Sequence, residues 1–99
     1  MLLDLLKKEP GDVFLNYALG LEYSNDLATL KEAESQYKKA LTLDQNYIAA
    51  YYQLGKLFES QDKNKEALGF YEQGLEKARL IKDNKSANEF EEAIFLLEE

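Results

Sequence analysis

Carboxylates are the most abundant groups in this sequence that could do chemistry, because 19 of its 99 residues are Asp or Glu. Pairs three or four residues apart, such as Glu89 and Glu92, would lie on one face of a helix. Two carboxylates can act as acid and base on a glycosidic bond when a pocket separates their pKa values. The sequence pattern places these pairs on solvent-facing surfaces, so we interpret them as solvated charge and predict no catalytic residue.

The sequence does not contain the residue types that other common catalytic and metal sites require. The sequence contains no His and no Cys, which removes thiol nucleophiles, disulfides, imidazole bases and the usual zinc ligands. It also has no D-x-[DN]-x-[DN]-G calcium loop and no glycine-rich phosphate loop. We therefore predict a protein that is not an enzyme, with no metal site and no cofactor.

Charge and hydropathy narrow the range of partners and compartments. The net charge of −7 repels phosphate backbones, so we expect no nucleic-acid partner. No stretch approaches the roughly 20 apolar residues that span a bilayer, and Asp4 interrupts the leucines at the start. The absence of Cys fits a reducing compartment. We expect a soluble, cytoplasmic protein with no membrane partner, folded as one domain.

An internal repeat is the strongest pattern in the sequence. Shifts of 35 and 34 residues both align the chain with itself, and the extra residue falls in a predicted turn at residues 24–26. Insertions are tolerated in turns, so the difference between the two shifts supports the alignment. The matched pairs are Tyr17 with Tyr52, Leu19 with Leu54, Gly20 with Gly55, Tyr23 with Phe58, Ala33 with Ala67, and Tyr37 with Tyr71.

Each copy of the repeat predicts two helices, because its apolar residues recur at steps of three and four. Short polar residues mark the expected starts of these helices. Gly20 and Gly55 lie inside helices, where each costs about 1 kcal/mol relative to Ala. We expect this cost to allow a close approach of the two helices, with Ala33 and Ala67 facing the glycines. The expected starts of the helices are Asp12, Asn25 or Asp26, Asp44 or Asn46, and a capping box formed by Ser86 and Glu89. Gln61 and Asp62 should form a turn.

These residues resemble the tetratricopeptide repeat, whose pattern is W-x2-L-G-x2-Y followed by A-x3-F and often a Pro. The resemblance covers about residues 13–80 and departs from the pattern at Asn16, Gln45, Gly74 and Arg79. The first copy reads Asn16-x2-Leu19-Gly20-x2-Tyr23 and then Ala33-x3-Tyr37; the second reads Tyr51-x2-Leu54-Gly55-x2-Phe58 and then Ala67-x3-Tyr71.

The resemblance implies an all-α fold, an α-solenoid of antiparallel helix hairpins in a right-handed superhelix. We expect a single domain over residues 1–99, with a half-repeat helix at 1–10, repeats at 12–45 and 46–80, and a capping helix at 84–99. In the capping helix, Ala87, Phe90, Ile94 and Leu97 would form one apolar stripe with a charged outside.

In this family the first helices of successive repeats line a concave groove. The resemblance implies a groove for a peptide of another protein, with the chain acting as an adaptor or scaffold. Only Lys56 is basic among the groove positions, so the clamp for a partner's C-terminal carboxylate found in chaperone-binding members is not expected. The groove residues would be Phe14, Tyr17, Leu21, Tyr52 and Lys56.

Two alternatives remain open at this point. Phe14 and Leu21 could pack on the preceding half-repeat, and Tyr17 and Tyr52 could pack between repeats. The leucine-rich start, or the terminal helix through Phe95, could instead join two copies of the chain in a weak homodimer.

Overall fold

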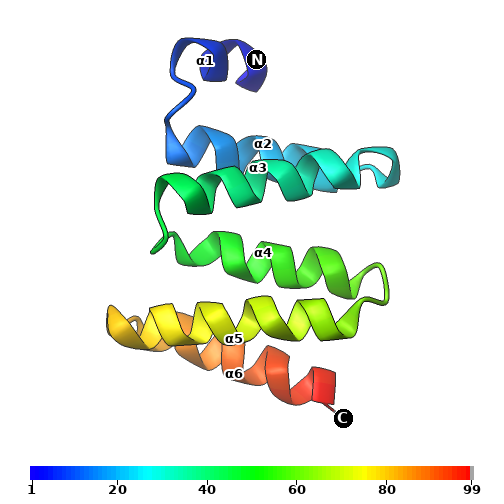
Figure 1. The fold of residues 1–99 in the computed structure, drawn as a ribbon, viewed down its shortest axis with the longest axis vertical. Coiled ribbons are helices and arrows are strands. Elements are labelled where there is room, and N and C mark those ends of the chain that lie inside the picture. Colours follow the sequence, from blue (N-terminus) through cyan, green and yellow to red (C-terminus); the bar gives the residue numbers. More distant parts are fainter. Residues whose placement is uncertain (99) are drawn as a thin grey trace. The chain divides into compact units, whose positions relative to one another are not determined.

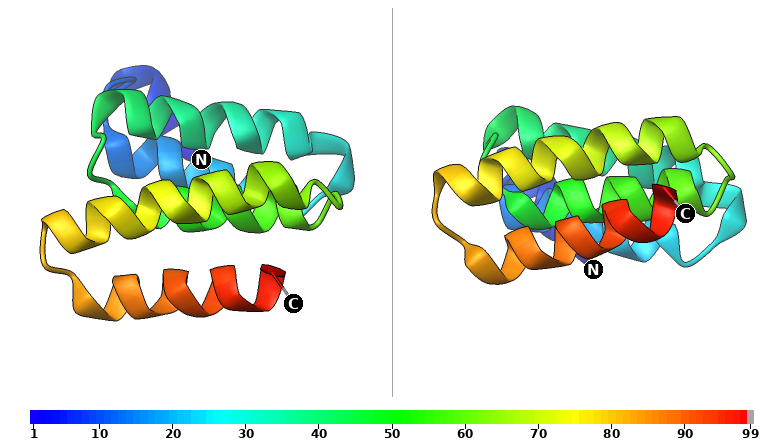
Figure 2. Two further views of the ribbon diagram at one scale, coloured as in Figure 1. Left: turned by 60° about the horizontal axis from the view of Figure 1, so that its bottom comes forward. Right: turned by 90° about the horizontal axis from the view of Figure 1, so that it is seen from below.

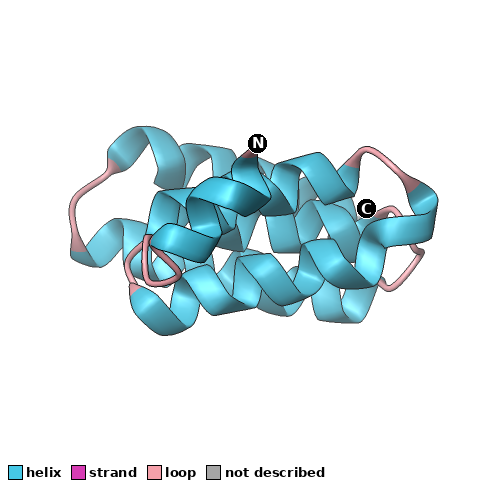
Figure 3. Cartoon of the chain, turned by 90° about the horizontal axis from the view of Figure 1, so that it is seen from above, coloured by secondary structure: helices cyan, strands magenta, loops and turns pink. Residues whose placement is uncertain are grey.

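The computed structural model describes residues 1–98, and within them every regular element is helical (Figure 1, Figure 3). The predicted all-α repeat fold is confirmed. The helices are α1 (Leu2–Lys8), α2 (Val13–Ser24), α3 (Leu30–Leu43), α4 (Ile48–Glu59), α5 (Asn64–Leu80) and α6 (Asn84–Glu98), with a short 3-10 turn, η1 (Leu27–Thr29).

The chain forms two compact units, Met1–Ala50 and Tyr51–Glu99. In the first unit, α1 packs on α2 and α2 packs on α3. In the second unit, α5 packs on α6, and the two helices run antiparallel (Figure 2). Most of α4 belongs to this second unit.

Aspartates cap two of the helices. The Asp12 carboxylate accepts a hydrogen bond of 2.9 Å from the Leu15 N–H, which confirms the predicted start of α2. The Asp83 carboxylate accepts hydrogen bonds from both the backbone N–H and the hydroxyl of Ser86 at the start of α6. These hydrogen bonds hold the pKa of Asp83 below its usual value, because they favour the charged carboxylate.

Three predicted helix starts are wrong. Asp26 caps η1 through the Ala28 N–H, and α3 begins only at Leu30. Asp44 bonds the Asn46 N–H in a turn, and α4 begins later, at Ile48. The predicted capping box at Ser86 fails because α6 begins at Asn84 and Ser86 lies inside its first turn. Asp26 and Asp44 accept N–H groups two residues further along and so form local turns before the α-helices, whereas Asp83 accepts the Ser86 N–H in place of a capping box.

Non-glycine residues in the left-handed region close both turns of the second unit. Asp62 and Lys82 have φ angles of 60° and 61°. Beyond Asp62, the Lys63 N–H reaches back to the Phe58 carbonyl at 2.9 Å, and beyond Lys82 the Asp83 N–H reaches the Ala78 carbonyl at 2.8 Å. These bonds satisfy the last carbonyls of α4 and α5, as a Schellman motif does. The turn predicted at Gln61 and Asp62 is confirmed.

Repeat-signature residues make up most of the core. All of them except Tyr23 are buried, and Tyr37 and Tyr71 are completely inaccessible to solvent. The buried members are Leu19, Gly20, Ala33 and Tyr37 in the first unit, and Tyr51, Leu54, Gly55, Phe58, Ala67 and Tyr71 in the second.

Tyrosine rings lie against the two helix glycines. A Cβ atom added to Gly20 would lie 2.5 Å from Tyr37 Cε1, and a Cβ added to Gly55 would collide with the Tyr71 ring. The atoms nearest to the two glycines thus belong to the tyrosines, which the sequence did not indicate; that Ala33 and Ala67 also face this contact stays a prediction. Each glycine leaves room for an aromatic ring to pack on the backbone of the facing helix, which is a larger apolar contact than a methyl group provides.

The two buried tyrosine hydroxyls have partners at matching places in the repeat. The Tyr37 hydroxyl lies 2.8 Å from Ser24 Oγ, and the Tyr71 hydroxyl donates to Glu59 Oε1 at 2.8 Å. Burial raises the pKa of both phenols. The nearby Glu59 carboxylate raises the pKa of Tyr71 further, because it disfavours a second negative charge.

Two departures from the family pattern also have a structural reason. Asn16 replaces the usual aromatic residue and is fully buried, and its Nδ2 donates to the carbonyls of Pro10 at 3.1 Å and Asp12 at 2.8 Å. It thereby fixes the connection between α1 and α2. Gly74 replaces an alanine, and the Phe90 ring of α6 fills the space where a side chain would lie.

Alanine at Gly55 and alanine at Gly69 should change stability in opposite directions. Both glycines lie inside helices, but a Cβ at Gly69 would meet nothing within 4 Å. Gly69→Ala should stabilise the protein by about 1 kcal/mol through helix propensity alone. Gly55→Ala should destabilise it by about 1–3 kcal/mol, because the new methyl group overpacks the Tyr71 ring. Urea unfolding followed by circular dichroism measures both changes, and a stabilised Gly55→Ala variant would contradict this packing.

The Tyr71→Phe variant should lose more stability than Tyr37→Phe, because only Tyr71 donates to a carboxylate. We expect about 1–2 kcal/mol for Tyr71 and about 1 kcal/mol for Tyr37. The raised pKa of Tyr71 also predicts a pH effect. Its contribution is complete below pH of about 10, where the unfolded phenol is protonated, and is lost as the pH rises toward the higher folded pKa.

Urea unfolding between neutral pH and about pH 11 tests this prediction. Wild-type stability should fall above about pH 10, and Tyr71→Phe should remove more of that fall than Tyr37→Phe. Equal pH profiles for the two variants would show that Glu59 has no effect on the buried phenol.

Candidate functional site

The first three predicted groove residues, Phe14, Tyr17 and Leu21, lie on α2. Phe14 is 61% exposed and Leu21 is 39% exposed, so neither side chain is buried. Tyr17 is half-buried, and its ring centroid lies 5.8 Å from that of Tyr37 and 5.2 Å from that of Tyr47. Tyr17 therefore combines a structural contact with a partly accessible surface, whereas Phe14 and Leu21 are available to a partner.

Tyr52 and Lys56 lie together on α4 in the second unit. The Lys56 Nζ atom lies 5.4 Å from the centroid of the Tyr52 ring, a cation–π contact. The other contacts of the ring are with Tyr71 at 5.9 Å and Phe90 at 5.8 Å between centroids. The core therefore holds Tyr52 in place, while Lys56 remains exposed.

A pocket of about 230 Å³ lies between α4 and α6 beside these two residues. Small-molecule sites usually begin at about 300 Å³, so this pocket suits a single side chain better than a whole ligand. Its walls combine an aromatic ring, apolar groups and charges. The lining residues are Tyr52, Lys56 and Glu59 of α4, and Glu89, Glu92, Ala93 and Leu96 of α6.

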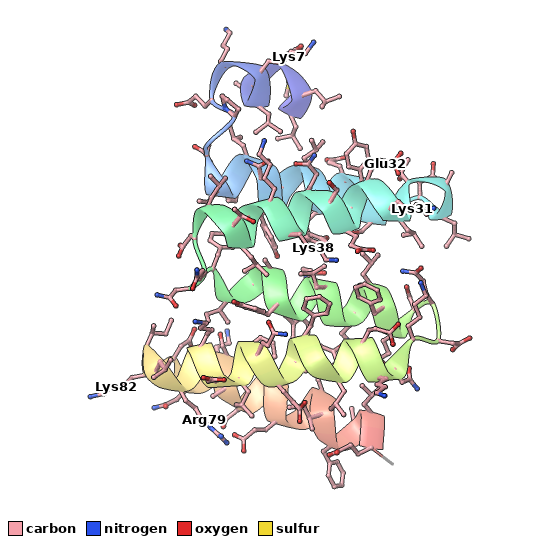
Figure 4. The ribbon with its side chains drawn as sticks, viewed as in Figure 1. Lys7, Lys31, Glu32, Lys38, Arg79 and Lys82 are labelled. Carbon is pink, nitrogen blue, oxygen red and sulfur yellow. The ribbon has the colours of Figure 1, made fainter. Side chains whose placement is uncertain are left out.

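The pocket is acidic, since it has three carboxylates and one ammonium group among its lining residues. Glu59 is oriented by the Tyr71 hydroxyl, which donates to one of its oxygens. Arg79 is paired outside the pocket, because its Nη2 lies 3.4 Å from Glu91, which is not among the lining residues. Lys82 extends away from the helices at the turn between α5 and α6 (Figure 4).

The contribution of α6 to this pocket was missed from the sequence. Glu89 and Glu92 were interpreted only as solvated charge, and Ala93 and Leu96 were not singled out. Residues 89, 92, 93 and 96 follow the three-and-four spacing of a helix face, separate from the apolar stripe through Phe90. That spacing could have revealed a second face on α6, but nothing in the sequence shows that it lies opposite α4.

Within residues 1–98, no group of three or more acidic side chains is placed to hold a metal ion. None of the helices in that range is long and apolar enough to cross a membrane. The arrangement offers contact surfaces: an apolar face on α2 and an acidic, aromatic pocket beside α4.

Comparison with known proteins identifies the fold family. A family model described as a TPR (tetratricopeptide) repeat matches residues 29–62, from the end of η1 to the turn after α4. A tetratricopeptide repeat domain protein from Salinibacter ruber is 32% identical; its solution structure has a TM-score of 0.83, and the match covers 90% of this chain and 89% of that one. The crystal structure has a TM-score of 0.78, with 88% and 96% covered.

A third similar structure extends over nearly the whole sequence. The solution structure of a protein from Bordetella parapertussis is 25% identical, with a TM-score of 0.83, and the match covers 97% of this chain and 83% of that one. No curated protein matches this sequence. Domains of the tetratricopeptide type generally bind other proteins or peptides. Because the Salinibacter ruber protein shares identity and fold with this chain over almost its full length, the chain belongs to the tetratricopeptide repeat family.

Proposed function

We propose that this protein is a non-enzymatic interaction module that binds a short segment of another protein and acts as an adaptor or scaffold. The observation that carries the proposal is the exposed apolar face of α2. Phe14 is 61% exposed one turn before the half-buried Tyr17, and Leu21 is 39% exposed one turn after it. A face with three large apolar side chains at successive turns is typical of a binding surface.

The α4 face supports the same function in the second unit. Tyr52 is fixed by two aromatic neighbours, so it loses little side-chain entropy when a partner covers it. Rigid aromatic anchors of this kind often carry much of the binding energy in interfaces. We therefore retain Phe14, Tyr17 and Leu21 on α2, and Tyr52 and Lys56 on α4, as the proposed contact residues. The Cys-free composition supports a cytoplasmic location for this module.

Exchanging Phe14 and Leu21 for Ala should abolish most peptide binding without affecting the fold, because both side chains are exposed. The probe is a set of peptides selected from a phage-displayed random dodecapeptide library on the immobilised wild-type protein. We expect Phe14→Ala with Leu21→Ala to weaken these peptides by about 10-fold or more. Fluorescence anisotropy measures the affinities, and thermal unfolding confirms that the variant remains folded.

Leu27→Ala is the matched control, since Leu27 is 88% exposed in the same unit but lies in η1, outside α2. It should bind the selected peptides as the wild type does. The proposal fails if no peptide is enriched, or if the α2 variant and the control bind equally well. Tyr17→Ala and Tyr52→Ala are poorer tests, because both rings contact the buried tyrosines of the core.

Self-association is a second candidate function, and exposed apolar residues of α1 and α6 favour it. Leu3 and Leu5 of α1 are 51% and 47% exposed, and Phe95 of α6 is 64% exposed. If these residues join two copies, the molar mass should rise toward twice that of the monomer with increasing concentration. Leu3→Ser with Leu5→Ser should reduce this rise. Light scattering on a sizing column measures it, and a monomer at every concentration would exclude this candidate.

A further inference from the structure

The α4–α6 pocket contains negative charge that the chain itself leaves uncompensated. Glu89 and Glu92 form no hydrogen bond or ion pair through their side chains with any other residue in the range 1–98. The one arginine of the sequence, Arg79 on α5, is paired with Glu91 instead. Lys56 is the single cation among the lining residues, against three carboxylates. An anionic side chain would be repelled from this pocket, whereas a second cation would be attracted.

The position of Lys56 shows that a cation is favourable at the aromatic wall of the pocket. Its ammonium group lies over the Tyr52 ring at 5.4 Å from the centroid. Lys56 is exposed and lies on a flexible four-carbon stem, so it can move aside at little cost. The ring that it covers is held by Tyr71 and Phe90, and is therefore a fixed platform for another cation.

The size and apolar wall of the pocket restrict the cation further. A volume of about 230 Å³ accommodates one long side chain. Ala93 and Leu96 of α6 lie beside the carboxylates, and Leu96 is 59% exposed, which offers an apolar surface for a methylene stem. Lys and Arg combine such a stem with a cationic end. A metal ion fits less well, because no group of three acidic residues within 1–98 converges on one point.

We infer that the α4–α6 pocket binds a basic side chain, Lys or Arg, of the protein segment that this module recognises. This inference rests on the proposed interaction function and adds the chemical class of the partner to it. In the bound state the cation would lie over Tyr52 and between the carboxylates of Glu89 and Glu92, and Lys56 would leave the face of the ring but stay in contact with the partner at the edge of the pocket.

The probe is the acetylated, amidated tripeptide Leu-Arg-Leu, compared with the same tripeptide carrying norleucine or Glu in the middle. Backbone amide shifts of the ¹⁵N-labelled protein should change at α4 and α6 on titration with the Arg peptide. We expect the Arg peptide to bind about 5-fold more tightly than the norleucine peptide, and the Glu peptide to bind more weakly than both. The advantage of Arg should shrink as salt is added.

Two variants with opposite expected effects keep the test independent of folding failures. Glu89→Gln with Glu92→Gln should remove most of the preference for Arg over norleucine. Lys56→Gln should strengthen binding of the Arg peptide by about 2- to 3-fold, because it removes the competing cation. The matched control is Glu72→Gln with Glu76→Gln, which makes the same charge change at exposed positions of α5 outside this pocket and should retain the preference.

The inference is overturned if no peptide shifts the α4 and α6 amides, if Arg and norleucine peptides bind equally, or if the control variant loses the preference as fully as the pocket variant. Its failure is distinguishable from failure of the proposed function. Library peptides that depend on Phe14 and Leu21 but show no preference for a basic residue would overturn the inference alone. Arg selection at the pocket, together with library peptides that ignore the α2 face, would overturn the α2 binding proposal alone.

Discussion

The contact on which the rest of each unit depends is a tyrosine ring packed against a glycine in the facing helix. Tyr37 lies against Gly20 in the first unit, and Tyr71 lies against Gly55 in the second. Both rings are completely buried, so their apolar area contributes to the core in full. The glycines cost helix propensity, and the ring contact offsets that cost by bringing the two helix backbones close together.

This contact also determines what the surface of α4 presents. The Tyr71 ring packs beside Tyr52, and the Tyr71 hydroxyl donates to Glu59. The same arrangement exists in the first unit, where Tyr17 packs on Tyr37 and the hydroxyl meets Ser24. Ser24 and Glu59 occupy equivalent positions of the repeat, but Ser24 is a neutral partner and Glu59 is a charged one. The core geometry is thus repeated, whereas the charge that it presents is not.

A third ring–glycine contact, in the second unit, places α6. Phe90 lies against Gly74 of α5, and its ring is 5.8 Å from that of Tyr52 and 6.4 Å from that of Tyr71 between centroids. With Phe90 fixed on this side, Glu89 and Glu92 lie beside α4, and the acidic pocket results. An alanine in place of Gly74, as the family usually has, would collide with the Phe90 ring. The departure at Gly74 therefore positions the helix that completes the pocket.

The sequence by itself determined the helical repeat, because its apolar spacing, its paired glycines and its aromatic positions are local and periodic. It also correctly indicated the cap at Asp12 and the turn at Asp62. It failed at the start of α3, where Asp26 caps η1 instead, and at the start of α6, where Asp83 accepts the Ser86 N–H. The tertiary structure alone decided that tyrosine rings meet the glycines, and that Glu89 and Glu92 of α6 line one pocket with Tyr52 and Lys56. Contacts between helices depend on how side chains pack in three dimensions, and a one-dimensional pattern records only which face of each helix is apolar.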